Sequence, residues 1–218
     1  MQSKSIVFRF VLTAGVLATP VIIAVLTMEK FALHAAVNGH HTMLGDMFFR
    51  YATHLADGIT PTLLALVLLF VKDFRSFLMM ALSCGLSAIV TQLLKRQVFA
   101  DHDRPAMFRD GLGDMQWVPD IVLNNHFSFP SGHATAAFAM CLSLAVILGR
   151  RSWVMGWAVL AALLAFSRVY LSQHFMEDIL VGAVIGTAVA TLVHHWLYVS
   201  PFSRTAWLHR RAFGQLNQ

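Results

Sequence analysis

The sequence predicts an all-α protein, an integral membrane bundle of six transmembrane helices. Composition, the lengths of the apolar stretches and the placement of basic residues predict this fold class. The chain has 218 residues, of which 57% are hydrophobic and 12% are charged, so it has too little polar surface to cover a soluble globule. About 20 apolar residues in a helix cross the hydrocarbon core of a bilayer, which is about 30 Å thick. We therefore expect a single membrane domain over residues 1–218.

Six apolar stretches are long enough, or nearly so, to cross a bilayer. They cover residues 6–27, 55–71, 76–94, 133–149, 153–171 and 178–198. The first is longer than the apolar region of a signal peptide and lacks a small-residue cleavage site, so we interpret it as an uncleaved span. In the second, Asp57, Gly58 and Pro61 interrupt the beginning. Because such residues disfavour an apolar helix, the sequence defines the start of this second span only to within about one turn.

The segment 28–54 mixes apolar and polar residues at roughly helical spacing, and we expect a short interfacial helix there. His40 and His41 are adjacent, so their side chains diverge on a helix, and no cysteine or carboxylate partner is indicated nearby. We therefore interpret them as surface histidines, not metal ligands. The same interpretation applies to His194 and His195.

Residues 95–132 form the second outer segment, a loop that is longer than most connections. Loops of this length are often lids or binding elements. Solvation is the ordinary role of its carboxylates, although repulsion of a charged headgroup and cation binding stay open. These carboxylates belong to Asp101, Asp103, Asp110, Asp114 and Asp120.

The basic residues predict the orientation of the bundle. With six spans, most of them lie on the side of both termini, which the positive-inside rule makes cytoplasmic. These residues are Lys4, Arg9, Lys72, Arg75, Arg150, Arg151, Arg204, Arg210 and Arg211. The compact loops and the lack of long tails favour a bacterial inner membrane, with the opposite face in the periplasm. The net charge of +5 comes from scattered single residues, a pattern that excludes a nucleic-acid partner.

His174 and Asp178 lie four residues apart at the entry to the last span, so we expect them to share one helical face. A carboxylate that accepts a hydrogen bond from one imidazole nitrogen leaves the other nitrogen free to attack phosphorus. His174 is then the candidate nucleophile and Asp178 the residue that orients it. The alternative is a pair that only caps the helix, but Arg168 lies six residues earlier and makes an isolated pair a poorer interpretation.

His133 begins the fourth span directly after Pro130, Ser131 and Gly132. Free backbone N–H groups at a helix start attract an anion, and glycine lets the backbone approach a ligand closely. Ser131 and Gly132 are therefore expected to hold phosphate oxygens. His133 is expected to protonate the leaving oxygen and then to activate water. A capping role for Ser131 and an interfacial location for His133 remain the alternative.

Lys95, Arg104 and Arg168 supply positive charge for a phosphoryl-transfer transition state, in which positioning and electrostatics do most of the catalytic work. Arginine permits a bidentate grip that lysine does not. Lys95 and Arg96 have an ordinary alternative, because a basic pair often ends a span by reaching the interface. All the expected charged residues lie at span ends on the outer face, which favours one composite site.

These residues resemble the three signature motifs of the type 2 phosphatidic acid phosphatase (PAP2) superfamily, whose members are membrane relatives of the vanadium haloperoxidases. The family motifs are Lys followed by Arg-Pro, then Pro-Ser-Gly-His, then Ser-Arg-x5-His-x3-Asp. Here they are Lys95 with Arg104-Pro105, Pro130 to His133, and Ser167-Arg168 with His174 and Asp178. In the first motif, eight residues separate Lys95 from Arg104, whereas the family usually has six. Either the loop bulges or Arg96 takes the place of Lys95.

The resemblance implies hydrolysis of a lipid phosphate or diphosphate through a phosphohistidine intermediate, with no cofactor and no metal. His174 would be the nucleophile and His133 the acid and base. Phosphatidate, phosphatidylglycerol phosphate, undecaprenyl diphosphate and a lipid A phosphate group all satisfy the same site. A lipid phosphotransferase of the same fold is an alternative. A small membrane transporter is another, although transporters place charges near the bilayer midplane. The oligomeric state is open.

Overall fold

The computed structural model describes residues 2–113 and 115–212, and every regular element within these ranges is helical. Asp114 of the predicted outer loop lies outside the described residues. Six helices of 13 residues or more form the body of the molecule. They are α1 (Gln2–Thr27), α4 (Ile59–Val71), α5 (Phe74–Leu93), α7 (Gly132–Leu148), α8 (Val154–Tyr170) and α9 (Met176–His194).

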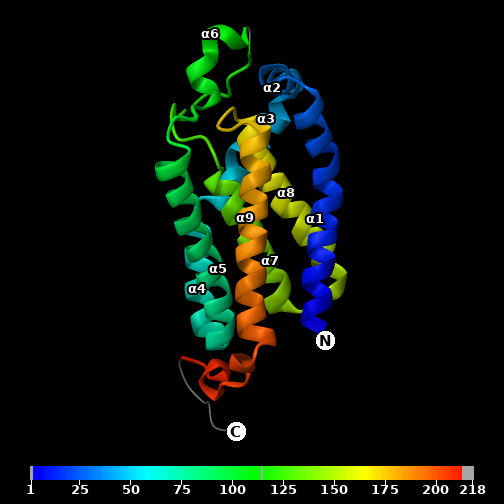
Figure 1. Ribbon diagram of the computed structural model, residues 1–218, viewed down its shortest axis with the longest axis vertical. Helices are drawn as coiled ribbons and strands as arrows, with labels where there is room; N and C mark the ends of the chain where they lie inside the picture. The colour runs from blue at the N-terminus through cyan, green and yellow to red at the C-terminus, as the bar shows by residue number, and fades with distance from the viewer. Residues whose placement is uncertain (1, 114, 213–218) are drawn as a thin grey trace.

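Shorter helices gather at the two ends of this bundle (Figure 1). At one end lie α2 (Lys30–Asn38), α3 (Met43–Ala52) with η1 (Thr53–Ala56), and η3 (Pro105–Phe108) with α6 (Arg109–Leu112). At the other end lie the start of α1 and the last described helical turns, which are η5 (His195–Val199), η6 (Pro201–Arg204) and η7 (Ala206–His209). The first and last described elements therefore lie at the same end.

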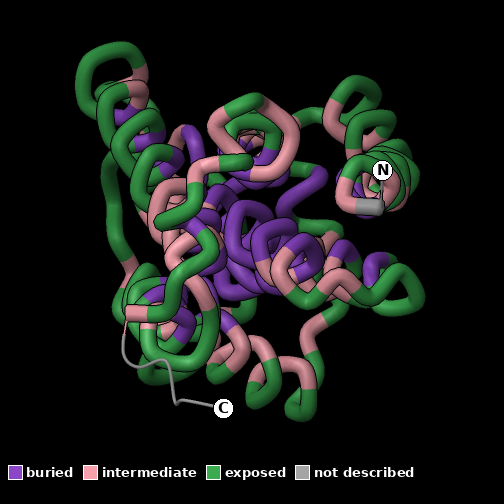
Figure 2. Tube along the Cα trace, turned by 90° about the horizontal axis from the view of Figure 1, so that it is seen from below, coloured by how far each residue is buried: buried purple, intermediate pink, exposed green. Residues whose placement is uncertain are grey.

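Helix α7 is the centre of the bundle, where Figure 2 shows the buried part of the chain. It packs against α5, α8 and α9. Its sequence is apolar all round, which is typical of a helix without a solvent face. Gly182 of α9 lies directly on the start of α7, and a Cβ atom there would be 2.5 Å from the carbonyl oxygen of Ser131. This close approach fixes α9 against the segment that carries the second motif.

The chain contains several helices suited to a bilayer, but the predicted number of six spans is not reproduced by helix length and composition. Four described helices are long and apolar enough to cross: Ser3–Thr27, Phe74–Val98, Arg151–Tyr170 and Met176–Val199. The segments Met43–Ala56 and Ile59–Val71 together give a fifth span if the 51° bend between them is counted as a break within one span. Helix α7 is apolar but shorter.

The second apolar helix begins at Ile59 and not at residue 55. Gly58 adopts a left-handed conformation with φ of 92°, and the Asp57 carboxylate accepts a hydrogen bond from the Ile59 nitrogen. Both features end the preceding turn and start the new helix. Segment 28–54 forms two helices, α2 and α3, where the sequence predicts one.

The side chains of two of the predicted surface histidines are buried, although the His41 residue as a whole is partly exposed. The His41 side chain is 1% exposed because it stacks on Tyr170 and lies 2.9 Å from the carboxylate of Asp46. His194 is buried against Tyr198 at the opposite end of the bundle. In both cases an aromatic ring from the same molecule covers the imidazole. His40 and His195 are exposed, as predicted.

Candidate active site

His174 lies in the turn between α8 and α9, and it is 1% exposed. Its Nδ1 atom donates to Oδ2 of Asp178 at 3.1 Å. Ser128, from the long outer loop, donates its hydroxyl to the same carboxylate oxygen and lies 3.3 Å from Nδ1 of His174. Both contacts of the ring involve Nδ1. The structure gives Nε2 of His174 no hydrogen bond within residues 2–113 and 115–212, so this nitrogen is available to react.

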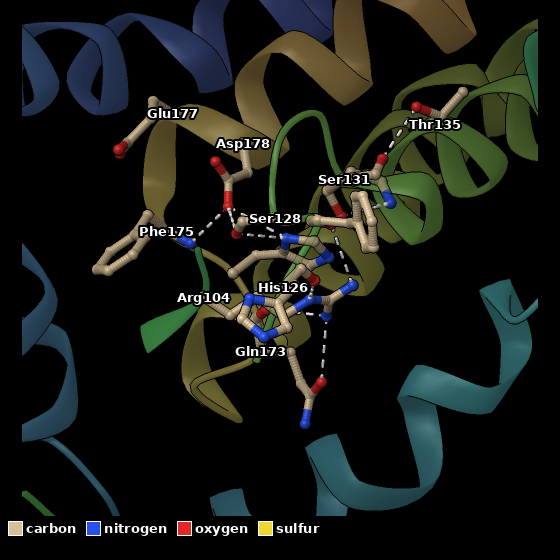
Figure 3. Close-up of polar contacts among 12 residues, drawn as sticks. Arg104, His126, Ser128, Ser131, Thr135, Gln173, Phe175, Glu177 and Asp178 are labelled. Atoms are coloured by element: carbon tan, nitrogen blue, oxygen red, sulfur yellow. Dashed lines mark hydrogen bonds and ion pairs between the residues drawn. The ribbon is translucent and has the colours of Figure 1, made fainter. Parts of the chain in front are cut away.

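The pair does not share one helical face as predicted, because α9 begins at Met176 and His174 precedes it. Asp178 lies in the first turn of α9, and its Oδ2 also accepts from the backbone nitrogen of Phe175 at 3.0 Å. Figure 3 shows Phe175 and Ser128 meeting Asp178 from different segments. Asp178 therefore caps the helix and holds His174 at once, so the two interpretations of the sequence are compatible.

Three cations surround His174. Burial of the ring lowers the pKa of His174 well below its ordinary value, and the positive charges of Arg104, Arg168 and Lys95 lower it further. The same three cations and His174 also act electrostatically on His133. The imidazole of His174 is therefore neutral at neutral pH and is surrounded by positively charged side chains. This combination suits a nucleophile that attacks a multiply charged anion.

The structure distinguishes Lys95 from Arg96. Lys95 is 7% exposed and belongs to the group of cations around His174, whereas Arg96 is exposed. Both lie in η2 (Leu94–Val98), a π-helical turn that continues α5. A π turn accommodates an additional residue relative to an α-helix. This turn therefore takes up part of the longer spacing between Lys95 and Arg104.

Arg104 uses its guanidinium group to fix the backbone around the site. It donates to the carbonyl oxygens of His126 at 2.9 Å and Gln173 at 3.1 Å, and to the side-chain oxygen of Gln173 at 3.3 Å. These bonds connect the outer loop to the turn that carries His174, as Figure 3 shows for Arg104 and Gln173. Burial lowers the pKa of Arg104 from its ordinary value, but the group stays charged, as arginine does in proteins.

A hollow of about 350 Å³ opens beside Arg104. Its other lining residues are Asn124, Asn125, His126 and Phe127, all from the outer loop. The carboxylate of Asp103 holds the His126 ring at 2.7 Å. The hollow therefore has walls with hydrogen-bonding side chains next to one of the three cations.

The second motif lies at the start of α7, as predicted. Ser131 is the N-cap residue, and its hydroxyl accepts from the Ala134 nitrogen at 3.4 Å. Its own backbone nitrogen donates to the carbonyl of Asp178 at 3.0 Å, which ties the second motif to the third. Gly132 and His133 form the first turn and are partly exposed. Ser131 thus has a capping contact, while Gly132 and His133 remain accessible to a ligand.

Arg168 occupies the last turn of α8 and is 7% exposed. Its Nη1 atom donates to the hydroxyl of Thr53 at 2.7 Å. Its Nε atom is buried and has no hydrogen-bond partner among the described residues. Such a group is costly without a partner, which is consistent with a cation held ready for an anion.

Sequence reasoning did not identify Ser128, Gln173 or Thr53. Ser128 lies three residues before Ser131, with no periodic or charge pattern that marks it. Gln173 directly precedes His174, and this adjacency is the only signal for it in the sequence. Thr53 lies 115 residues from Arg168 along the chain, so no local pattern connects the two.

Comparisons with known proteins identify the family of this chain. A model of the PAP2 superfamily matches residues 76–201, which is more than half of the chain and includes every candidate site residue. Lipid phosphate phosphatase 2 of Arabidopsis thaliana is 26% identical over 72% of this chain, and the chain spans 64% of that relative, less than two thirds of its length.

Two bacterial proteins are also similar. Lipid A 4'-phosphatase of Porphyromonas gingivalis is 25% identical over 81% of this chain and 75% of its own length. The crystal structure of Aquifex aeolicus LpxE superposes with a TM-score of 0.65 and 26% identity, covering 75% of this chain and 93% of that one. Fold, motifs and family match together lead to one conclusion: the chain is an integral membrane protein that belongs to the PAP2 superfamily.

Proposed function

We propose that this protein is a membrane lipid phosphatase that hydrolyses a lipid phosphomonoester or diphosphate through a phosphohistidine intermediate. The observation that carries the proposal is the setting of His174. This buried, neutral imidazole is held through Nδ1 by Asp178 and is surrounded by Lys95, Arg104 and Arg168. Relatives that are lipid phosphate and lipid A phosphatases support the same reaction class.

In the first step, Nε2 of His174 attacks phosphorus, and the bond between phosphorus and the leaving oxygen breaks. His133, in its protonated form, donates a proton to that oxygen as it leaves. Asp178 stabilises the positive charge that develops on His174, because it accepts the hydrogen bond from Nδ1. The lipid leaves as an alcohol, or as a lipid monophosphate if the substrate is a diphosphate.

In the second step, neutral His133 removes a proton from water as the water oxygen attacks the phosphohistidine. The bond between phosphorus and nitrogen breaks, and inorganic phosphate is released. Lys95, Arg104 and Arg168 stabilise the charge on the phosphoryl oxygens in both steps, and Ser131 and Gly132 hold these oxygens at the start of α7. Because these cations supply the positive charge, the reaction requires no metal ion.

The proposal includes the orientation of the protein. Six segments cross the membrane, including the bent α4 and the short α7, and both termini lie in the cytoplasm. The active site then faces the periplasmic side of a bacterial inner membrane, since most basic residues lie at the opposite end. The hollow beside Arg104 receives part of the lipid headgroup.

The test is release of inorganic phosphate by the purified protein in detergent with EDTA. The substrates are phosphatidate, phosphatidylglycerol phosphate, undecaprenyl diphosphate and lipid A. We expect release from at least one of them in EDTA and none from the His174→Ala variant. If a well-folded wild-type protein releases phosphate from none of them, hydrolysis is wrong, and transfer of the phosphoryl group to an acceptor lipid is the alternative to measure.

A further inference from the structure

Helix α3 turns its charged residues toward the protein. The Asp46 carboxylate accepts from the Tyr170 hydroxyl at 2.8 Å and lies 2.9 Å from Nδ1 of His41. Arg50 donates to Asp120 of the outer loop at 3.2 Å. Both charged residues of α3 are therefore paired with other parts of the same molecule.

Most large apolar residues of α3 point away from the protein, whereas Phe49 packs on Phe166 and Tyr170 of α8. Five large side chains are between 54% and 88% exposed: Met43, Leu44, Met47, Phe48 and Tyr51. A surface helix of a soluble protein has the reverse arrangement, with its apolar face buried and its charges in water. An exposed apolar face of this size requires an apolar environment.

The neighbouring helix indicates which environment this is. After η1, the chain continues into α4, whose exposed side chains are also large and apolar, including Ile59, Leu63 and Phe70. The chain bends by 51° between the helical segments Met43–Ala56 and Ile59–Val71. Figure 1 shows α3 at the end of the bundle that carries the outer loop. The apolar surface of α3 is thus continuous with that of a helix suited to hydrocarbon.

We propose that α3 lies at the boundary between headgroups and acyl chains of the lipid leaflet on the active-site side, with its five exposed apolar residues in the lipid. An amphipathic helix binds this boundary with its apolar face inserted by about 5–10 Å. The bend to α4 is then the point where the chain turns from the plane of the membrane into the bilayer.

This location has a consequence for the site, which rests on the proposed function. Thr53, in the turn that directly follows α3, accepts the hydrogen bond from Arg168. No other side-chain hydrogen bond of Arg168 is found in residues 2–113 and 115–212. Lipid that holds α3 therefore also holds Thr53, and Thr53 is a positioning residue for the Arg168 guanidinium.

The depth of α3 is tested with single cysteines in a Cys84→Ala, Cys141→Ala background, labelled with bimane in vesicles of phosphatidylcholine and phosphatidylglycerol. Leu44→Cys and Phe48→Cys report on α3. Asp110→Cys on α6 is the aqueous control, and Leu63→Cys on α4 is the acyl-chain control. Quenching is measured with iodide in water and with nitroxides attached to lipid at shallow and deep positions.

We expect the α3 labels to be quenched most by shallow nitroxides and at least fivefold less by iodide than the label at position 110. Quenching by iodide equal to that at position 110 would overturn the proposal. Efficient disulfide formation between two copies of the Leu44→Cys variant would also overturn it, because a second protein chain would then cover the face. Neither result depends on enzymatic activity.

The link to Arg168 is tested by activity in the same vesicles. Thr53→Val is expected to lower kcat at least tenfold without changing the depth of the α3 labels, and Thr53→Ser is expected to restore it. Leu44→Asp is expected to lower activity, whereas Val122→Asp, on the exposed loop, is not. Wild-type activity in Thr53→Val would refute the link. A wild-type protein without activity would contradict the proposed function and leave the depth result intact.

Discussion

Ser128 donates its hydroxyl to Oδ2 of Asp178, the carboxylate oxygen that also accepts from His174. Together with the Phe175 nitrogen, three donors meet at this one atom. The carboxylate that orients His174 is therefore itself held in place by the outer loop, by the turn before α9 and by α9.

Replacing Ser128 by alanine is expected to lower kcat about 10- to 100-fold, since one hydrogen bond to a charged group contributes roughly 1.5–3 kcal/mol. KM should change little because the Ser128 hydroxyl is engaged with Asp178 and His174. Ser143→Ala is the matched control: Ser143 is also buried but bonds only to backbone carbonyls within the bundle. Steady-state kinetics of both variants provide the measurement, and equal effects would contradict the role of Ser128.

Lys95 and Arg96 should differ strongly when each is replaced by alanine. Loss of a group that stabilises transition-state charge typically costs about 100- to 1,000-fold in kcat, and we expect this for Lys95→Ala. Arg96 is exposed, so Arg96→Ala should stay within about twofold of wild type, as is usual for surface positions. Phosphate release measures both, and the reverse order would show that Arg96 fills the first motif.

Gly182→Ala is expected to destabilise the protein and to impair activity. The added Cβ would be 2.5 Å from the Ser131 carbonyl oxygen and 3.0 Å from the Ala134 side chain, and overpacking of this kind costs about 1–3 kcal/mol. Gly156→Ala on α8 is the control, because nothing lies within 4 Å of its Cβ position. Thermal unfolding in detergent should show a lower midpoint for Gly182→Ala alone.

His34 should make the stability depend on pH. It is buried beside Phe175, and its Nε2 atom lies 3.2 Å from the Ser172 hydroxyl. Burial lowers the pKa of His34 from 6.5 to about 4. Between these values the unfolded chain binds the proton and the folded protein does not, so the free energy of unfolding rises with pH. The contribution of His34 to stability is therefore present above pH 6.5 and is lost as pH falls from 6.5 toward 4.

The measurement for His34 is the unfolding midpoint of the wild type and of His34→Gln between pH 7.5 and pH 5. Glutamine keeps a hydrogen-bonding nitrogen near the position of Nε2 but does not titrate in this range. We expect the midpoint of the variant to fall less toward low pH than that of the wild type. Parallel curves would show that His34 does not titrate in this window.

The sequence is informative where residues with fixed spacing lie at helix ends. Ser131, Gly132 and His133 could be located at the start of a helix because capping and helix geometry are local properties. Arg168 could be located in the last turn of α8 for the same reason. Their meeting around one point was inferred from the number of spans, and the structure brings these residues together at the same end of the bundle.

Contacts between segments that are far apart in the sequence could not be predicted from such local patterns. Ser128 and Asp178 are 50 residues apart, and no periodicity in the sequence connects them. The burial of His41 has the same origin, because α2 and α3 fold back onto Tyr170 at the end of α8. The start of α4 depends on the left-handed conformation of Gly58, which the sequence permits without requiring it.

The central claim is that His174 carries the phosphoryl group, and trapping the intermediate tests it most directly. The protein is mixed with a lipid phosphate labelled with ³²P and quenched in alkaline detergent, in which phosphohistidine survives. The label should be found on the peptide that contains His174 and should be absent from His174→Ala. Phosphate release without a labelled protein, or label that persists in His174→Ala, would contradict the account.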